Sequence, residues 1–86
     1  MGKTMKTWDL TAFNPAMKSV LVEVCNTNDG AISYETDEIE PEIKAAAVEL
    51  KKLGLVLADF GSDEIIVMLT VDGDTWLRSL PEGALS

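Results

Sequence analysis

Apolar residues recur every three or four positions in two segments of the chain, and each segment begins at a proline. The first covers 15–26, with its apolar stripe at Met17, Val20, Leu21, Val24 and Cys25. Asn14 offers a side-chain acceptor to a free backbone N–H, while Pro15 already holds the φ angle of a helix. We predict a helix over 15–26 that buries this stripe.

The second segment runs over 41–53. Its predicted buried stripe consists of Ile43, Ala46, Ala47, Leu50 and Leu53. Gly54 follows where a left-handed C-terminal cap belongs, and Leu55 beyond it is placed to contact Leu50. We predict a helix over 41–53 and interpret its alanines as packing surface.

Strand-forming residues dominate the stretch that comes next. The segments 55–58 and 64–69 are rich in Leu, Ile and Val, and the turn residues of 60–63 separate them. Together they are predicted to form a β-hairpin. Thr70 is then expected to cap a last helix over 71–80, which a proline ends.

The remaining ordered segments are harder to assign. A short strand is expected over 31–34, followed by an acidic connector over 35–40. Near the N-terminus, Trp8, Leu10 and Phe13 bring large side chains that a small core needs. The pattern leaves open whether they lie in a short helix or in an extended arm packed on the body.

Length and composition favour a single domain. A chain of 86 residues with 47% hydrophobic residues has enough material for one core, since a domain of this size buries roughly 60 to 65% of its unfolded surface. We expect 1–6 to be a flexible tail and 82–86 to be frayed. No apolar run approaches the length of a membrane span and no secretory signal follows Met1, so a cytoplasmic location without membrane contact is expected.

The run over 41–80 resembles the second half of a winged-helix domain. The step from helix to wing is Lys51-Lys52-Leu53-Gly54-Leu55-Val56, and the strand-to-helix ending is Leu69-Thr70-Val71-Asp72-Gly73-Asp74-Thr75-Trp76-Leu77. The resemblance covers about half the chain well and most of it loosely, and its motifs are patterns of apolar and cap residues. It implies an α+β fold of about three helices with a C-terminal β-hairpin as the wing, and it makes 15–26 the first helix.

The sequence departs from the family at two places. Only 32–40 is available for the second helix and its turn, which implies a degraded or one-turn helix. The family places the helix at 41–53 in the DNA major groove, where this chain offers Glu42, Lys44, Ala45, Val48, Glu49, Lys51 and Lys52. The wing carries Asp59, Asp63 and Glu64, which would face phosphates with like charge.

Net charge bears on the function that the resemblance implies. Seven Lys plus Arg against 15 Asp plus Glu give −8, which disfavours nucleic acid as a ligand of a lone monomer. The first hypothesis is a winged-helix-like regulator that touches DNA as a dimer or beside a partner through Lys44, Lys51 and Lys52. Because these lysines sit at i, i+7 and i+8, one helix face can present all three.

The second hypothesis is a protein-interaction module that keeps the scaffold. Its partner surface would comprise Glu42, Ala45, Val48 and Glu49. A special form would be a phage- or plasmid-type inhibitor that imitates the charge of DNA. Salt separates the two hypotheses, because phosphate contacts weaken steeply as salt is added and contacts through Ala45 and Val48 should not.

Candidate chemistry is sparse, and we expect no enzymatic activity. The chain has no His to activate Cys25, which we interpret as a buried small hydrophobe. The acidic residues Glu35, Asp37, Glu38, Glu40 and Glu42 lack the spacing of a calcium loop, so a solvated face beside a helix N-terminus is the simpler interpretation. No cofactor or metal is expected.

Overall fold

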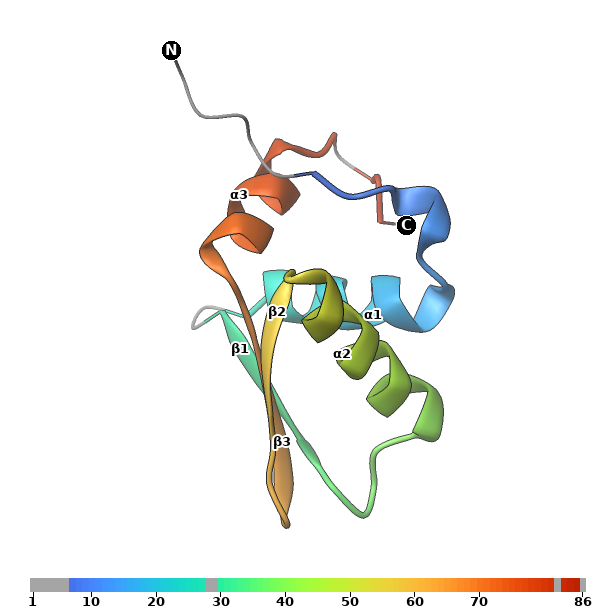
Figure 1. Ribbon diagram of the computed structural model, residues 1–86, viewed down its shortest axis with the longest axis vertical. Coiled ribbons are helices and arrows are strands. Elements are labelled where there is room, and N and C mark those ends of the chain that lie inside the picture. Colours follow the sequence, from blue (N-terminus) through green and yellow to red (C-terminus); the bar gives the residue numbers. More distant parts are fainter. Residues whose placement is uncertain (1–6, 28–29, 82, 86) are drawn as a thin grey trace.

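The computed structural model shows three α-helices and one antiparallel sheet, an α+β fold (Figure 1). It describes residues 7–27, 30–81 and 83–85. The elements follow in the order η1 (Leu10–Ala12), α1 (Pro15–Cys25), β1 (Ala31–Glu35), α2 (Pro41–Leu53), β2 (Val56–Phe60), β3 (Glu64–Leu69) and α3 (Val71–Ser79). The predicted helices and hairpin are therefore confirmed, with ends that move by one or two residues.

The helix ends form where the cap residues predicted them. Asn14 Oδ1 accepts a hydrogen bond from the Met17 N–H at 2.8 Å and starts α1. Gly54 adopts a left-handed φ of 82° after α2, and the Leu55 N–H then donates to the Leu50 carbonyl oxygen at 3.1 Å. These caps fix where each helix stops and the next element begins.

Thr70 joins the hairpin to the last helix. Its hydroxyl oxygen accepts from the Gly73 N–H at 2.9 Å and donates to the Gly54 carbonyl oxygen at 2.7 Å. Gly73 is buried, and a Cβ at this position would overlap the Leu55 carbonyl oxygen. Glycine is therefore required here for α3 to approach the start of β2.

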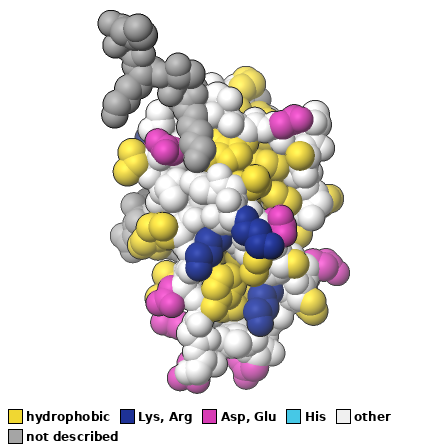
Figure 2. All heavy atoms as spheres, viewed as in Figure 1, with side chains coloured by type: hydrophobic (Ala, Val, Ile, Leu, Met, Phe, Trp, Pro, Cys, Tyr) yellow, Lys and Arg dark blue, Asp and Glu magenta, His cyan; other side chains and the backbone are white. Residues whose placement is uncertain are grey.

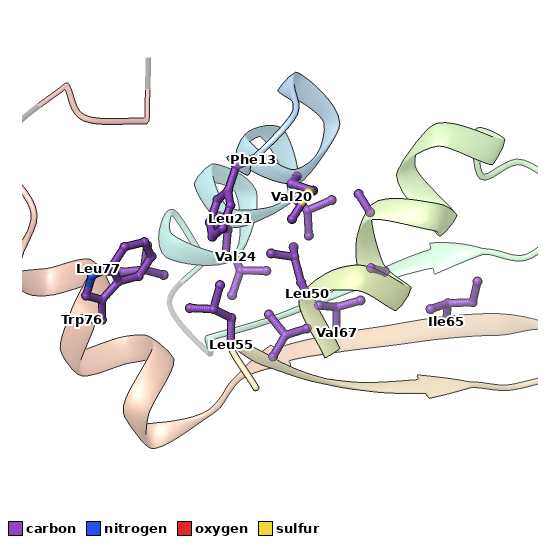
Figure 3. Packing of buried hydrophobic residues seen from close by; sticks show 14 residues of the cluster. Phe13, Val20, Leu21, Val24, Leu50, Leu55, Ile65, Val67, Trp76 and Leu77 are labelled. Carbon is purple, nitrogen blue, oxygen red and sulfur yellow. The ribbon is translucent and has the colours of Figure 1, made fainter. Parts of the chain in front are cut away.

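The sheet has the strand order β1-β3-β2, with both pairings antiparallel. Side chains alternate between its two faces. The inner face, which includes Val56, Ile65 and Val67, packs against α1 and α2. Figure 3 shows both helices on one side of the strands, with Val24 and Leu50 pointing into the space between the layers.

The N-terminal arm packs on the body and contains one short helical turn. Trp8 and Phe13 both contact Trp76 in edge-to-face geometry, with ring centroids 5.2 and 6.0 Å apart. The Trp8 Nε1–H donates to the Leu53 carbonyl oxygen at 2.8 Å. The two alternatives left open by the sequence thus occur together, because η1 interrupts an otherwise extended arm.

The connector between β1 and α2 makes a single turn. The Ile39 N–H donates to the Glu35 carbonyl oxygen at 2.9 Å, and Ile39 packs partly buried against the core. In the described residues no helix lies between β1 and α2.

Two predicted core positions are wrong. Cys25 is exposed, because it lies about 100° around the helix from the fully buried Val24 and therefore faces the flank of α1. Leu53 is 37% exposed. It occupies the last position of α2, where the chain turns away and fewer neighbours cover the side chain.

Candidate binding surfaces

The three lysines named by the sequence lie on the exposed side of α2. We call Lys44, Lys51 and Lys52 the lysine face; all three are exposed. In the view of Figure 2, basic side chains gather over the middle of the molecule around apolar atoms, with an acidic side chain beside them, while other acidic side chains lie toward the rim. Lys44 and Lys51 are seven residues apart, which corresponds to about 10 Å along the helix.

Neighbouring side chains hold two of these lysines. The Lys51 Nζ lies 5.6 Å from the centre of the Phe60 ring, within the range of a cation–π contact. The Lys52 Nζ lies 3.7 Å from a carboxylate oxygen of Glu49 one turn earlier. Both members of that pair are exposed, so the contact orients Lys52 and adds little stability.

The residues of the predicted partner surface share α2 with the lysines. Glu42, Ala45 and Glu49 are exposed and Val48 is half-buried. Successive residues lie about 100° apart around the helix, so Val48 falls between the lysines at 51 and 52. The structure therefore places both predicted surfaces on one helix and interleaves their residues.

The acidic residues of the hairpin point away from α2. Along β2, Phe60 occupies an inner-face position, whereas Asp59 occupies the opposite face. On β3, Glu64 likewise lies opposite the buried Ile65. Of the three wing carboxylates that the sequence suggests would oppose phosphates, Asp59 and Glu64 therefore lie on the face of the sheet that points away from α2. Asp63 lies in the turn between the strands and lines the same hollow as these two.

The sheet has a second exposed surface, which the sequence analysis missed. We call it the outer sheet face. It is formed by the side chains of the three strands that point away from α1 and α2: Ala31, Ser33, Glu35, Leu57, Asp59, Glu64, Ile66 and Met68. Leu57 is 56% exposed and Met68 is 40% exposed, so large apolar side chains contact solvent here.

A signal for this surface is present in the sequence. The run 65–69 is apolar at every position, whereas a strand with one solvated face normally alternates. An unbroken run indicates apolar side chains on both faces of the strand. In β3 Ile65 and Val67 of the inner set are buried, and Met68 of the outer set is exposed.

Cross-strand pairing arranges the outer sheet face in rows. Leu57, Met68 and Ala31 are direct neighbours across the three strands and form an apolar row at one end. At the hairpin end, Glu64 lies directly opposite Glu35. The face therefore changes from apolar to acidic along its length.

The acidic end of this face is hollowed. Five carboxylates line a shallow depression around Ile66: Glu35, Asp37, Asp59, Asp63 and Glu64. Within the described ranges, no group of three or more His, Cys, Asp or Glu side chains is arranged to hold a metal ion. The hollow is thus a concentrated negative surface.

The thiol of Cys25 lies at the edge of a separate hollow between α1 and α3. Partial burial raises the pKa of this thiol, and the Asp74 carboxylate raises it further. The thiolate is the nucleophilic form, so these surroundings make Cys25 less reactive than a free cysteine.

None of the helices in the described part of the chain is long and apolar enough to cross a membrane.

Comparisons with protein-family models, with curated protein sequences and with solved structures find no match to this chain.

Proposed function

We propose that this domain is a winged-helix-like, DNA-associated regulator in which α2 contacts the duplex, as a dimer or beside a partner. The observation that carries the proposal is the separation of charge between the two sides of the sheet. Lys44, Lys51 and Lys52 are exposed on α2, while Asp59 and Glu64 point from the opposite face.

Salt screening limits how far the carboxylates of the sheet act on a ligand at α2. The two shorter axes of the domain measure 24 and 23 Å. Because one Debye length at 0.1 M salt is about 10 Å, the carboxylates that lie farthest from α2 across the domain are screened more strongly than the groups on α2 itself. A phosphate beside α2 would therefore respond mainly to the groups on α2, where Lys44 and Lys51 lie near the Lys52–Glu49 ion pair, and the net charge of −8 would weigh less.

The order of the elements supports the winged-helix interpretation. In the winged-helix interpretation, α1 is the first helix and α2 is the recognition helix. The hairpin of β2 and β3 is the wing, and it lies beside α2 (Figure 1). β1 pairs with β3, which makes the hairpin part of a three-stranded sheet. The single turn at 36–39 stands where the family has its second helix.

The alternative proposal is a protein-interaction module that uses the same helix. The ion pair between Lys52 and Glu49 favours it, because a mixed-charge surface around Ala45 and Val48 suits a protein partner better than a polyanion. Binding of this kind would depend only weakly on salt.

Fluorescence anisotropy of a labelled mixed-sequence duplex with the purified protein tests the first proposal. Three phosphate contacts predict a slope of about −2.7 for log affinity against log salt. Saturable binding at 50 mM salt should therefore weaken by about 40-fold at 200 mM. Binding with no salt dependence would favour the protein-interaction module.

Matched variants locate the contact. The double variant K44Q/K51Q should reduce the magnitude of the slope by about 2, because each lost phosphate contact removes about one unit. Lys18→Gln is the control, since Lys18 lies on α1. An equal loss in K18Q would mean that net charge alone drives binding. Absence of saturable binding at 50 mM salt would reject DNA association.

A further inference from the structure

We propose that the outer sheet face docks a basic, amphipathic segment of a partner protein. This surface is distinct from α2, so the inference goes beyond the proposed function. Two observations carry it: an exposed apolar row, and a charge pattern that only a cationic partner complements.

The apolar row lacks a covering layer. α1 and α2 both pack against the inner face of the sheet (Figure 3). In the described part of the chain Leu57 and Met68 keep 56% and 40% of their surface exposed. Adjacent exposed side chains of this size mark a contact surface more often than isolated ones do. An apolar side of a partner would gain free energy by covering this row.

The acidic end specifies the charge of the partner. Glu35 and Glu64 face each other directly across the strands, an arrangement that destabilises a sheet. All charged residues that point outward from the three strands are acidic: Glu35, Asp59 and Glu64. Lysine or arginine side chains placed here would relieve this repulsion. The hollow around Ile66 gives them room.

A second copy of this chain is a poor occupant. If two outer sheet faces met with their apolar rows aligned in parallel, Glu35 and Glu64 would meet the same carboxylates of the other copy. In the antiparallel arrangement, Leu57 and Met68 would cover carboxylates, which leaves charge desolvated and unpaired. A segment with Leu-like side chains at one end and Lys or Arg at the other matches both rows.

NMR with an amphipathic probe tests the proposal directly. The probe is a synthetic peptide with Leu side chains in one half and Lys side chains in the other, added to ¹⁵N-labelled protein, and its control is the same peptide with every Lys replaced by Glu. We expect the Lys peptide to shift the amide signals of β1, β2 and β3 and to leave those of α2 unchanged. The Glu peptide should shift none of them.

Paired variants separate the apolar and the acidic contributions. L57T/M68T should weaken binding of the Lys peptide by about tenfold, whereas Val22→Thr, which replaces an exposed apolar residue of α1 with threonine, should not. Glu35→Lys should weaken binding several-fold, while Glu38→Lys makes the same charge change in the connector and should leave it intact. Circular dichroism of each variant confirms the fold.

Three results would overturn the proposal. The first is the absence of shifts in the strands at millimolar peptide. The second is that the peptide shifts α2 instead. The third is equal weakening by the control variants, which would mean attraction to net charge. K44Q/K51Q should bind the peptide as tightly as the unaltered protein. A failure of the DNA-binding proposal can therefore be told apart from a failure of the peptide-docking proposal.

Discussion

The lysine face lies on α2, which packs against the inner face of the sheet, whereas the outer sheet face points away from both helices. The two surfaces differ in charge, in the element that presents them and in exposed apolar side chains. One presents Lys44, Lys51 and Lys52 from a helix; the other presents carboxylates from strands. A net charge of −8 describes neither surface. The placement of charge, set by helical and strand periodicity, decides which ligand each face can accept.

The two faces also differ in exposed apolar surface. On α2, Val48 is half-buried and Ala45 is small. On the outer sheet face, Leu57 and Met68 are both large and exposed. Binding to α2 should therefore be mainly electrostatic and sensitive to salt, whereas binding to the sheet should keep an apolar share that salt does not screen.

The same chemical change on the two sides of the sandwich should have very different effects on stability. Leu50 is fully buried between α2 and the sheet, and Leu57 points outward. We expect Leu50→Ala to lower the free energy of unfolding by about 3 kcal/mol, because it leaves a cavity in the core. Leu57→Ala should change it by less than about 0.5 kcal/mol.

Urea denaturation followed by circular dichroism measures both values. Leu50 also links α2 to the strands, so L50A should weaken both proposed binding activities, whereas L57A should affect only peptide binding. A large loss of stability in L57A would mean that the outer sheet face is part of the core.

Local signals in the sequence predicted the helices, the hairpin and the caps. Asn14, Gly54 and Thr70 act within a few residues of their own positions, so their roles do not depend on the rest of the fold. The exposure of Cys25 depends instead on how wide an arc of α1 the neighbouring elements bury. Periodicity along one helix gives the direction of the apolar stripe but not the width of the arc that is covered.

The lysine positions on α2 were also predictable, because the spacing of 44, 51 and 52 fixes their side of the helix. The direction in which the carboxylates of the hairpin point could not be predicted from the sequence. That direction depends on the pairing register, in which a slip of one residue would move Glu64 to the inner face. The unbroken apolar run over 65–69 indicates an outer apolar set on β3, but its pairing with Ala31 and Glu35 depends on β1 lying beside β3.

If Glu35 serves peptide docking, its carboxylate should lower the stability of the domain when no peptide is bound. Glu35→Lys replaces a like-charge pair opposite Glu64 with an opposite-charge pair, so it should raise the free energy of unfolding by about 0.5 kcal/mol. Urea denaturation at low salt and at 1 M NaCl checks this, because the gain should shrink as salt screens the pair. The same variant should weaken peptide binding.

Glu38→Lys again serves as the control. It changes the net charge equally, but Glu38 lies in the connector and outside the sheet. An equal gain in E38K would show that reduced overall repulsion, rather than the pair of Glu35 and Glu64, raises stability.

Adjacent residues on β1 lie in different surroundings, because Tyr34 faces the helices and Glu35 faces outward. Burial raises the pKa of Tyr34 to about 12, helped by the Glu23 carboxylate, which accepts the phenol hydrogen bond at 3.2 Å. The unfolded chain loses this proton near pH 10, whereas the folded chain keeps it to about pH 12. The contribution of Tyr34 to stability is therefore complete below pH 10 and is lost as the pH rises from about 10 to 12.

Tyr34 is the only tyrosine, so the absorbance of tyrosinate near 295 nm reports this residue alone. We expect a midpoint near pH 12 in the folded protein and near 10 in urea. Tyr34→Phe should remove the part of the stability loss between pH 10 and 12 that this proton causes. A folded-state midpoint near 10 would show that Tyr34 is as open to solvent as Glu35, and the contrast between the two faces of β1 would fail there.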